Sequence, residues 1–111
     1  MGVETIPNLP NIEVAKDKLR VIGSINFNTV VALRNLGDAI IKTESKLCFD
    51  FKDVTHADSS ALALLLAWLR LAKQQDKPLS FINLPESLLI MAQAFDIKSF
   101  LPLPSSSADL T

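Results

Sequence analysis

Residues 46–71, reading KLCFDFKDVTHADSSALALLLAWLRL, contain the pattern that decides the fold. The mostly apolar residues 46–51 fit a strand that is buried on both faces of a sheet. A tight polar loop follows, and residues 58–75 then place apolar side chains at helical spacing. Asp58 or Ser59 can cap this helix, because a side-chain oxygen accepts from the free amides of the first turn. The run therefore predicts one strand–helix unit of an α/β sheet.

The flanking segments continue the alternation of strands and helices. We expect strands at 12–15, 19–22, 46–51 and 79–84, and helices that begin near Asn28 or Thr29, at Asp58 and at Pro85. The first two strands indicate a hairpin, Asn28 can cap the first helix, and the third helix reaches about Phe95. The order β-β-α-β-α-β-α predicts an α/β fold with a mixed, mostly parallel sheet of about four strands and right-handed crossovers.

The length and composition predict one domain with its own core. The chain has 111 residues, of which 49% are apolar. We assign the domain to residues 12–101, preceded by an irregular, proline-containing lead-in at 1–11. Residues 102–111 are rich in serine and proline and predict a flexible C-terminal tail.

The charge balance and the cysteine count exclude several classes of partner. Eleven basic and twelve acidic residues nearly cancel, and no basic cluster is present, so we expect no nucleic-acid partner. Cys48 stands alone and is interpreted as a small buried hydrophobe. No signal peptide is visible, and the longest apolar run, 61–69, is too short to span a bilayer, which predicts a cytoplasmic protein.

The sequence contains no convincing catalytic, metal or cofactor signature. His56 lies between Asp53 and Asp58, and Ser59 follows three positions later, but nothing resembles a nucleophile elbow or an oxyanion loop. One histidine and Cys48 do not make a metal ligand set, and no glycine-rich loop could hold a phosphate. We therefore expect no enzyme activity and no cofactor, and we interpret His56 as a loop residue in water.

The helix at 58–75 is apolar over an unusually wide arc. One stripe should face the sheet and consists of Leu62, Leu65, Leu66 and Leu69. A second stripe lies to one side and consists of Ala61, Leu64, Trp68 and Leu71. Either neighbouring helices cover the second stripe, or it is a partner surface with Trp68 as the anchor. The same choice between core and partner surface applies to Phe81, Met91 and Phe95, and we expect these three in the core.

At these residues the chain resembles the STAS family, the small β/α domains of anti-sigma-factor antagonists and of sulfate-transporter tails. The resemblance rests on Phe49-Asp50-Phe51, Val54 and Ala57-Asp58-Ser59-Ser60-Ala61-Leu62, and the order of elements agrees over about residues 12–101. The family usually has glycine where this chain has Ala61. The added methyl group narrows access to the backbone beside Ser59, the position that is phosphorylated in the antagonist branch.

Within the family, the chain is similar to the STAS subunits of Mla-type ABC transporters, which maintain the lipid asymmetry of the outer membrane. This similarity lies in residues 61–66, 71–75, 91–97 and 100–102. This resemblance implies a non-catalytic subunit that binds the cytoplasmic ATPase subunit and, through it, the permease. Such a subunit lies at the inner membrane only through its complex. The candidate partner-binding residues are then Asp58, Ser59, Ser60, Ala61, Leu64 and Trp68.

A different branch of the family implies a different function. The alternative is an anti-sigma-factor antagonist whose partner is a serine kinase anti-sigma factor, with Ser59 as the phosphorylated residue. A phosphate on Ser59 would lie at the positive end of the helix, which tolerates it. A third possibility is a small-ligand STAS domain, for which the sequence offers no pocket signature.

Overall fold

The computed structural model describes residues 10–98, 101 and 102. Along the chain it has β1 (Asn11–Val14), β2 (Leu19–Ile25), α1 (Val30–Thr43), β3 (Leu47–Ala57), α2 (Ser59–Gln74), β4 (Leu79–Ile82) and α3 (Glu86–Ala94). The expected class and the order β-β-α-β-α-β-α are confirmed. The predicted lead-in falls outside the described residues up to position 9, and the predicted tail does so from position 103.

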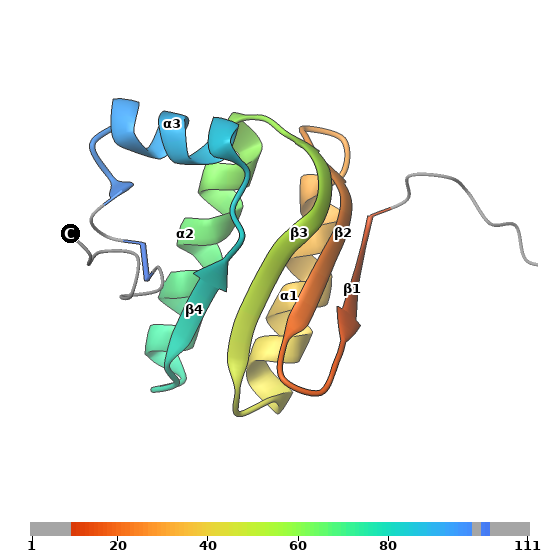
Figure 1. The fold of residues 1–111 in the computed structure, drawn as a ribbon. Helices are drawn as coiled ribbons and strands as arrows, with labels where there is room; N and C mark the ends of the chain where they lie inside the picture. Colours follow the sequence, from red (N-terminus) through yellow and green to blue (C-terminus); the bar gives the residue numbers. More distant parts are fainter. Residues whose placement is uncertain (1–9, 99–100, 103–111) are drawn as a thin grey trace, which may run out of the picture.

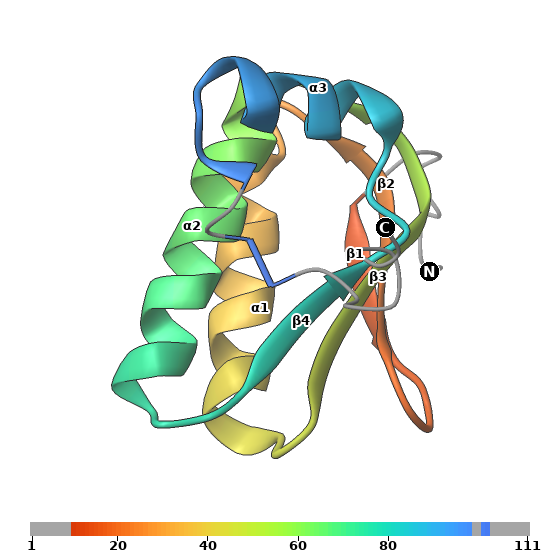
Figure 2. The same cartoon turned by 60° about the vertical axis from the view of Figure 1, so that its left-hand side comes forward.

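The four strands form one sheet in the order β1-β2-β3-β4. β1 and β2 pair antiparallel as the expected hairpin, and β2–β3 and β3–β4 pair parallel. Both crossovers advance across the sheet in the same direction, so their common handedness puts α1 and α2 on one face (Figures 1 and 2). α3 lies across the end of the molecule at which β4 leads into it (Figure 1).

The core fills the space between the sheet and the two helices. Along β2, buried residues alternate with half-buried ones, as expected for a strand with one covered face. The most buried stripe of α2 consists of Ala61, Leu65, Trp68 and Ala72, each at most 1% exposed. These spacings of four, three and four follow one helix face.

Trp68 occupies the centre of this core. Its ring stacks on Phe49 of β3, with centroids 4.5 Å apart and planes 12° apart. On its other side, a Cβ added at Gly37 of α1 would collide with the indole ring. Glycine at position 37 is thus required for the close approach of α1 to Trp68. Trp68 is therefore a packing residue shared by the sheet and both long helices.

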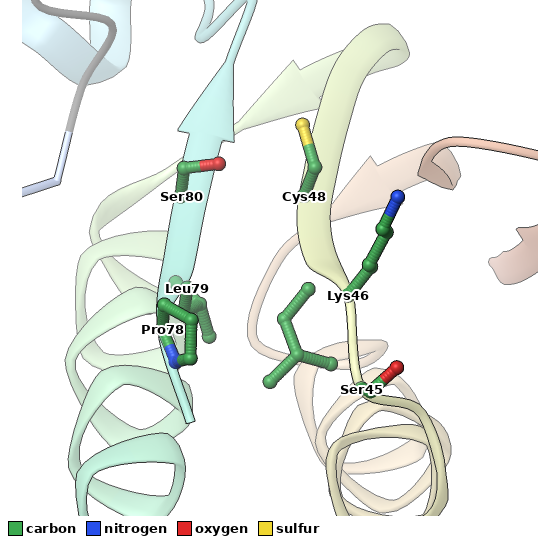
Figure 3. Close-up of a pocket in the computed structure, with 7 residues that line it drawn as sticks. Ser45, Lys46, Cys48, Pro78, Leu79 and Ser80 are labelled. Carbon is green, nitrogen blue, oxygen red and sulfur yellow. The ribbon is translucent and has the colours of Figure 1, made fainter. Parts of the chain in front are cut away.

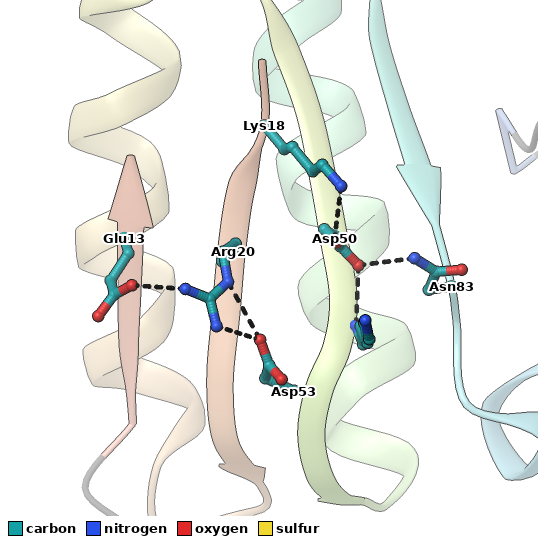
Figure 4. A network of polar contacts seen from close by, with 7 residues as sticks. Glu13, Lys18, Arg20, Asp50, Asp53 and Asn83 are labelled. Atoms are coloured by element: carbon teal, nitrogen blue, oxygen red, sulfur yellow. Dashed lines mark hydrogen bonds and ion pairs between the residues drawn. The ribbon is translucent and has the colours of Figure 1, made fainter. Parts of the chain in front are cut away.

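The face of the sheet opposite the helices carries a charged network (Figure 4). Arg20 of β2 donates from Nε to Asp53 at 3.1 Å and from an NH group to Glu13 of β1 at 2.9 Å. These pairs cross three neighbouring strands, and cross-strand pairs of opposite charge help to fix strand register.

Asp50 is the one buried charged residue in the described part of the chain, at 4% exposure. Burial raises the pKa of its carboxyl group. Hydrogen bonds from Asn83 and the Lys52 amide, with the nearby Lys18 charge, outweigh burial and bring the pKa below its ordinary value. Asp50 is therefore held as a carboxylate that bridges β3 to the end of β4.

Several element boundaries differ from the sequence expectation. β3 extends to Ala57, so the polar stretch after Phe51 is strand and not loop, and His56 lies on a strand rather than in a loop. The pairing with β2 shifts register twice along this stretch, between Arg20 and Ile22 and between Gly23 and Ser24. Such irregularities bend and twist a strand, which allows polar side chains to reach solvent.

The first helix is capped differently from the prediction. α1 begins at Val30, and the Asn26 side chain accepts from the amides of Asn28 and Thr29 at 2.8 and 3.1 Å. Asn28 does not cap the helix: the N-cap is Thr29, which makes no side-chain cap bond. The Asn26 side chain instead stabilises the turn before α1, in which the Val30 amide bonds the Asn26 carbonyl.

The ends of the domain also differ from the assignment. Asn11 belongs to β1, although it was placed in the lead-in. Leu101 is buried, and the Pro102 carbonyl accepts from the Phe81 amide of β4 at 3.0 Å. Pro102 thus packs on the sheet edge, although we expected the tail to begin there.

Candidate functional site

The start of α2 lies at the carboxyl end of the parallel strands. β3 leads into α2 through Asp58 alone, and the Asp58 amide donates to the Ile25 carbonyl at the end of β2. The Asp58 side chain accepts from the Ser60 amide at 2.8 Å, so of the two candidate caps, Asp58 and Ser59, the N-cap is Asp58. This geometry fixes the first turn of α2 to two strands, and open α/β sheets commonly present their binding sites at this end.

The six candidate partner-binding residues divide into an accessible group and a buried group. Ser59 is exposed, and Asp58 and Ser60 are half-buried, so these three can contact a partner. The other three belong to the core, with Ala61 and Trp68 at 0% and Leu64 at 1% exposure.

The choice of Trp68 as an interface anchor is therefore corrected. The second apolar stripe of α2 is covered by α1 and the sheet, so no partner can reach the Trp68 side chain on the folded domain. On the other predicted stripe, Leu62 and Leu65 are buried as expected, but Leu66 is 37% exposed. Phe95, which was expected in the core, is 63% exposed.

Two exposed apolar residues at the same end were missed by the sequence reasoning. Phe27, in the turn before α1, is 82% exposed, and Val31 in the first turn of α1 is 67% exposed. They are four residues apart in a turn that already carries helical hydrogen bonding, so both fall on one face. The sequence contains one signal for this exposure: Phe27 lies between two polar residues, Asn26 and Asn28, and outside any periodic apolar run.

A shallow groove separates α1 from α2 beside these residues. Its volume is about 190 Å³, and it is lined by Val30, Val31, Arg34, Ala63 and Leu64. Ser59 lies four residues before Ala63 on α2, hence on the same face one turn away. Ser59, Phe27, Val31 and the groove thus form one continuous surface, which we call the α1–α2 surface.

A second hollow, of about 270 Å³, lies at the opposite end of the sheet (Figure 3). It is formed by the starts of β3 and β4, with Lys46, Cys48, Pro78 and Ser80 among its lining residues. Cys48 is half-buried there, not fully buried as expected, because it lies on the sheet face without helices. The side chains that line this hollow do not reach the α1–α2 surface.

The groups considered for catalysis are dispersed. Asp53 is engaged by Arg20, and within the described chain no hydrogen bond joins His56 to Ser59. The part of the chain that the structure describes has no group of three His, Cys, Asp or Glu side chains able to hold a metal ion. The chemistry available at the α1–α2 surface is that of contact: a hydroxyl, apolar side chains and one guanidinium.

Comparison with protein families defines the class of protein to which this fold and site belong. The family described as Mlab, STAS domain matches residues 9–102, so the chain belongs to the STAS domain family. Members of this family are typically non-catalytic accessory domains. No curated protein sequence matches the chain.

Solved structures of family members differ in how similar they are to this chain. A chain of the Acinetobacter MlaFEDB complex in an ATP-bound Vtrans2 conformation is 35% identical, with a TM-score of 0.66, over 78% of this chain and 93% of that one. In the Vtrans1 conformation of the complex the values are 31% and 0.69, over 85% and 100%. The phosphorylated Bacillus cell fate determinant SpoIIAA is similar in fold, at 13% identity and a TM-score of 0.61 over 91% and 96%.

Among the described residues, no helix has the length and apolar character needed to cross a membrane.

Proposed function

We propose that this chain is the non-catalytic STAS subunit of a Mla-type phospholipid-transport ABC transporter, and that it binds and supports the cytoplasmic ATPase subunit. The main support is the 31–35% identity, over most of both chains, to a chain of the Acinetobacter MlaFEDB complex. In this function the protein is cytoplasmic, peripheral to the inner membrane through its complex, and contributes to outer-membrane lipid asymmetry.

The α1–α2 surface is the proposed contact with the ATPase subunit. Ser59 is exposed on a turn that is fixed by the Asp58 cap, and Phe27 presents a nearly complete aromatic ring to solvent. Exposed aromatic residues on rigid supports are frequent anchors of protein interfaces. Because hydrogen bonds already hold this turn in the free domain, docking would not require it to reorganise first.

An affinity purification tests this function. Tagged wild-type protein, expressed in its own cells, should retain an ABC ATPase and a permease, identified by mass spectrometry. Ser59→Glu should lose both, because the added charge lies within the contact. Ser45→Glu is the matched control: Ser45 is also exposed but lies at the opposite end of the sheet, so it should retain both partners.

The alternative function is an anti-sigma-factor antagonist that is switched by phosphorylation of Ser59. The exposure of Ser59 at a helix N-terminus favours it, as does the shared fold with SpoIIAA. Against it, Ala61 stands where the family usually has glycine, and its methyl group narrows access to the backbone beside Ser59. Recovery of a serine kinase in place of the ATPase, with phosphate on Ser59, would establish this alternative.

A further inference from the structure

The groove of the α1–α2 surface is lined by apolar residues and one charged residue. Val30, Val31, Ala63 and Leu64 supply apolar atoms, and Arg34 supplies a guanidinium. The Arg34 side chain is 54% exposed, and within the described chain it makes one ion pair, from Nε to Asp38 Oδ2 at 3.5 Å. A guanidinium has five N–H donors, so most of its donors face solvent or the groove.

The size of the groove favours a macromolecular occupant. Sites for small organic molecules usually enclose about 300–1,000 Å³, whereas this groove measures about 190 Å³ and is open along one side. A space of this kind fits a side chain of a docked protein better than a separate ligand. Val31 is one of the lining residues, and Ser59 lies one helical turn before the lining residue Ala63. Both belong to the proposed contact with the ATPase subunit.

The charge of Arg34 sets the chemistry of that occupant. A protein that covers the groove removes water from the guanidinium, and this is unfavourable unless an acceptor replaces the water. A carboxylate supplies two acceptor oxygens and matches the planar donor arrangement of arginine. The occupant should therefore carry an apolar side chain for the groove and an acidic side chain for Arg34.

We propose that the groove receives a segment of the ATPase subunit in which an apolar residue lies next to an Asp or Glu that pairs with Arg34. This inference rests on the proposed function and identifies the kind of ATPase segment that the STAS subunit recognises. The apolar contact supplies affinity, and the ion pair selects the cognate partner. An uncharged or basic residue there would cover the guanidinium and leave Asp38 as its one charged partner within the described chain.

Binding of purified cognate ATPase subunit to four forms of the full chain tests the proposal, at low and at high salt. Arg34→Glu should raise the Kd at least tenfold at low salt, because it sets two carboxylates against each other. Ala63→Phe should weaken binding comparably at both salt concentrations, because it fills the groove without changing charge. Arg70→Glu is the matched control, an exposed arginine on α2 outside the groove, and should stay within twofold of wild type.

The outcomes separate this proposal from the one on which it rests. Wild-type binding that Arg34→Glu leaves within twofold would overturn the groove proposal and leave the proposed function standing. Failure of the wild-type chain to bind the ATPase subunit would overturn both. A lysine substitution of one ATPase carboxylate that restores the affinity of Arg34→Glu would identify the pairing residue. Thermal melts of each variant verify that the domain is folded.

Discussion

Trp68 and Phe27 are two large aromatic residues of the same domain with opposite surroundings. Trp68 is fully buried between β3 and α1, and Phe27 is 82% exposed in the turn before α1. Judged by residue type alone, Trp68 would be a better interface candidate than Phe27, since tryptophan is enriched in binding hot spots. The comparison teaches that residue type alone does not determine burial: the Trp68 ring fits into the core because Gly37 leaves room for it.

The largest loss of stability is expected when Trp68, the buried aromatic residue, is replaced. Trp68→Ala removes the ring that fills the space between Phe49 and Gly37 and should lower the free energy of unfolding by about 3–5 kcal/mol. Urea denaturation followed by circular dichroism measures the change. Leu66→Ala, on the same helix but 37% exposed, should lose much less. Equal losses for the two variants would mean that Trp68 is not the centre of the core.

An intermediate effect is expected at Asp50, which is buried like Trp68 but charged. Asp50→Asn weakens the bonds from Asn83 and the Lys52 amide and should cost about 1–3 kcal/mol at neutral pH. Because the folded-state pKa is lowered, the carboxylate stabilises the fold above the ordinary value of about 3.9. That contribution is lost as the pH falls through the folded-state pKa.

Urea melts between pH 7 and pH 3 measure this prediction. The stability of the wild-type domain should fall more steeply with acidification than that of Asp50→Asn, so that the two curves converge at low pH. Asp17→Asn, in the exposed turn between β1 and β2, serves as the control and should follow the wild-type curve. Parallel curves for wild type and Asp50→Asn would show that Asp50 has no lowered pKa.

The smallest effect on stability is expected at Phe27, together with a large effect on binding. Phe27→Ser should change the free energy of unfolding by no more than about 0.5 kcal/mol, because the side chain makes few contacts in the free domain. Affinity for the ATPase subunit should fall at least tenfold. Phe95→Ser, which removes another exposed phenylalanine from the end of α3, should leave binding unchanged. A stability loss at Phe27 as large as at Trp68 would remove the distinction between the two.

The periodicity of the sequence predicted the class, the element order and the Asp58 cap, because these depend on local spacing and on turn chemistry. The length of β3 was missed. Its second half, Lys52 to His56, is polar except for Val54, because one sheet face has no helix over it. Two register shifts with β2 fall in this stretch. Alternation of apolar and polar residues, the usual strand signal, is interrupted at such shifts.

The candidate site was predicted only in part. Asp58, Ser59 and Ser60 were found because capping residues mark a helix start, and they are the accessible members of the set. Trp68 was ambiguous because its burial depends on Gly37, which lies 31 positions earlier and contributes no side chain to any apolar pattern. Arg34 was missed for a related reason: only the packing of α1 beside α2 brings it to a groove with Ala63.

The bond between the Pro102 carbonyl and the Phe81 amide has a consequence for aggregation. β4 is the last strand of the sheet, and an outward-facing amide on such a strand is a template for pairing with other chains. The Pro102 carbonyl accepts a hydrogen bond from this amide, and the buried Leu101 side chain anchors the segment to the core. A chain that is truncated before Leu101 would leave the Phe81 amide without this partner, and β4 would then be open to self-association.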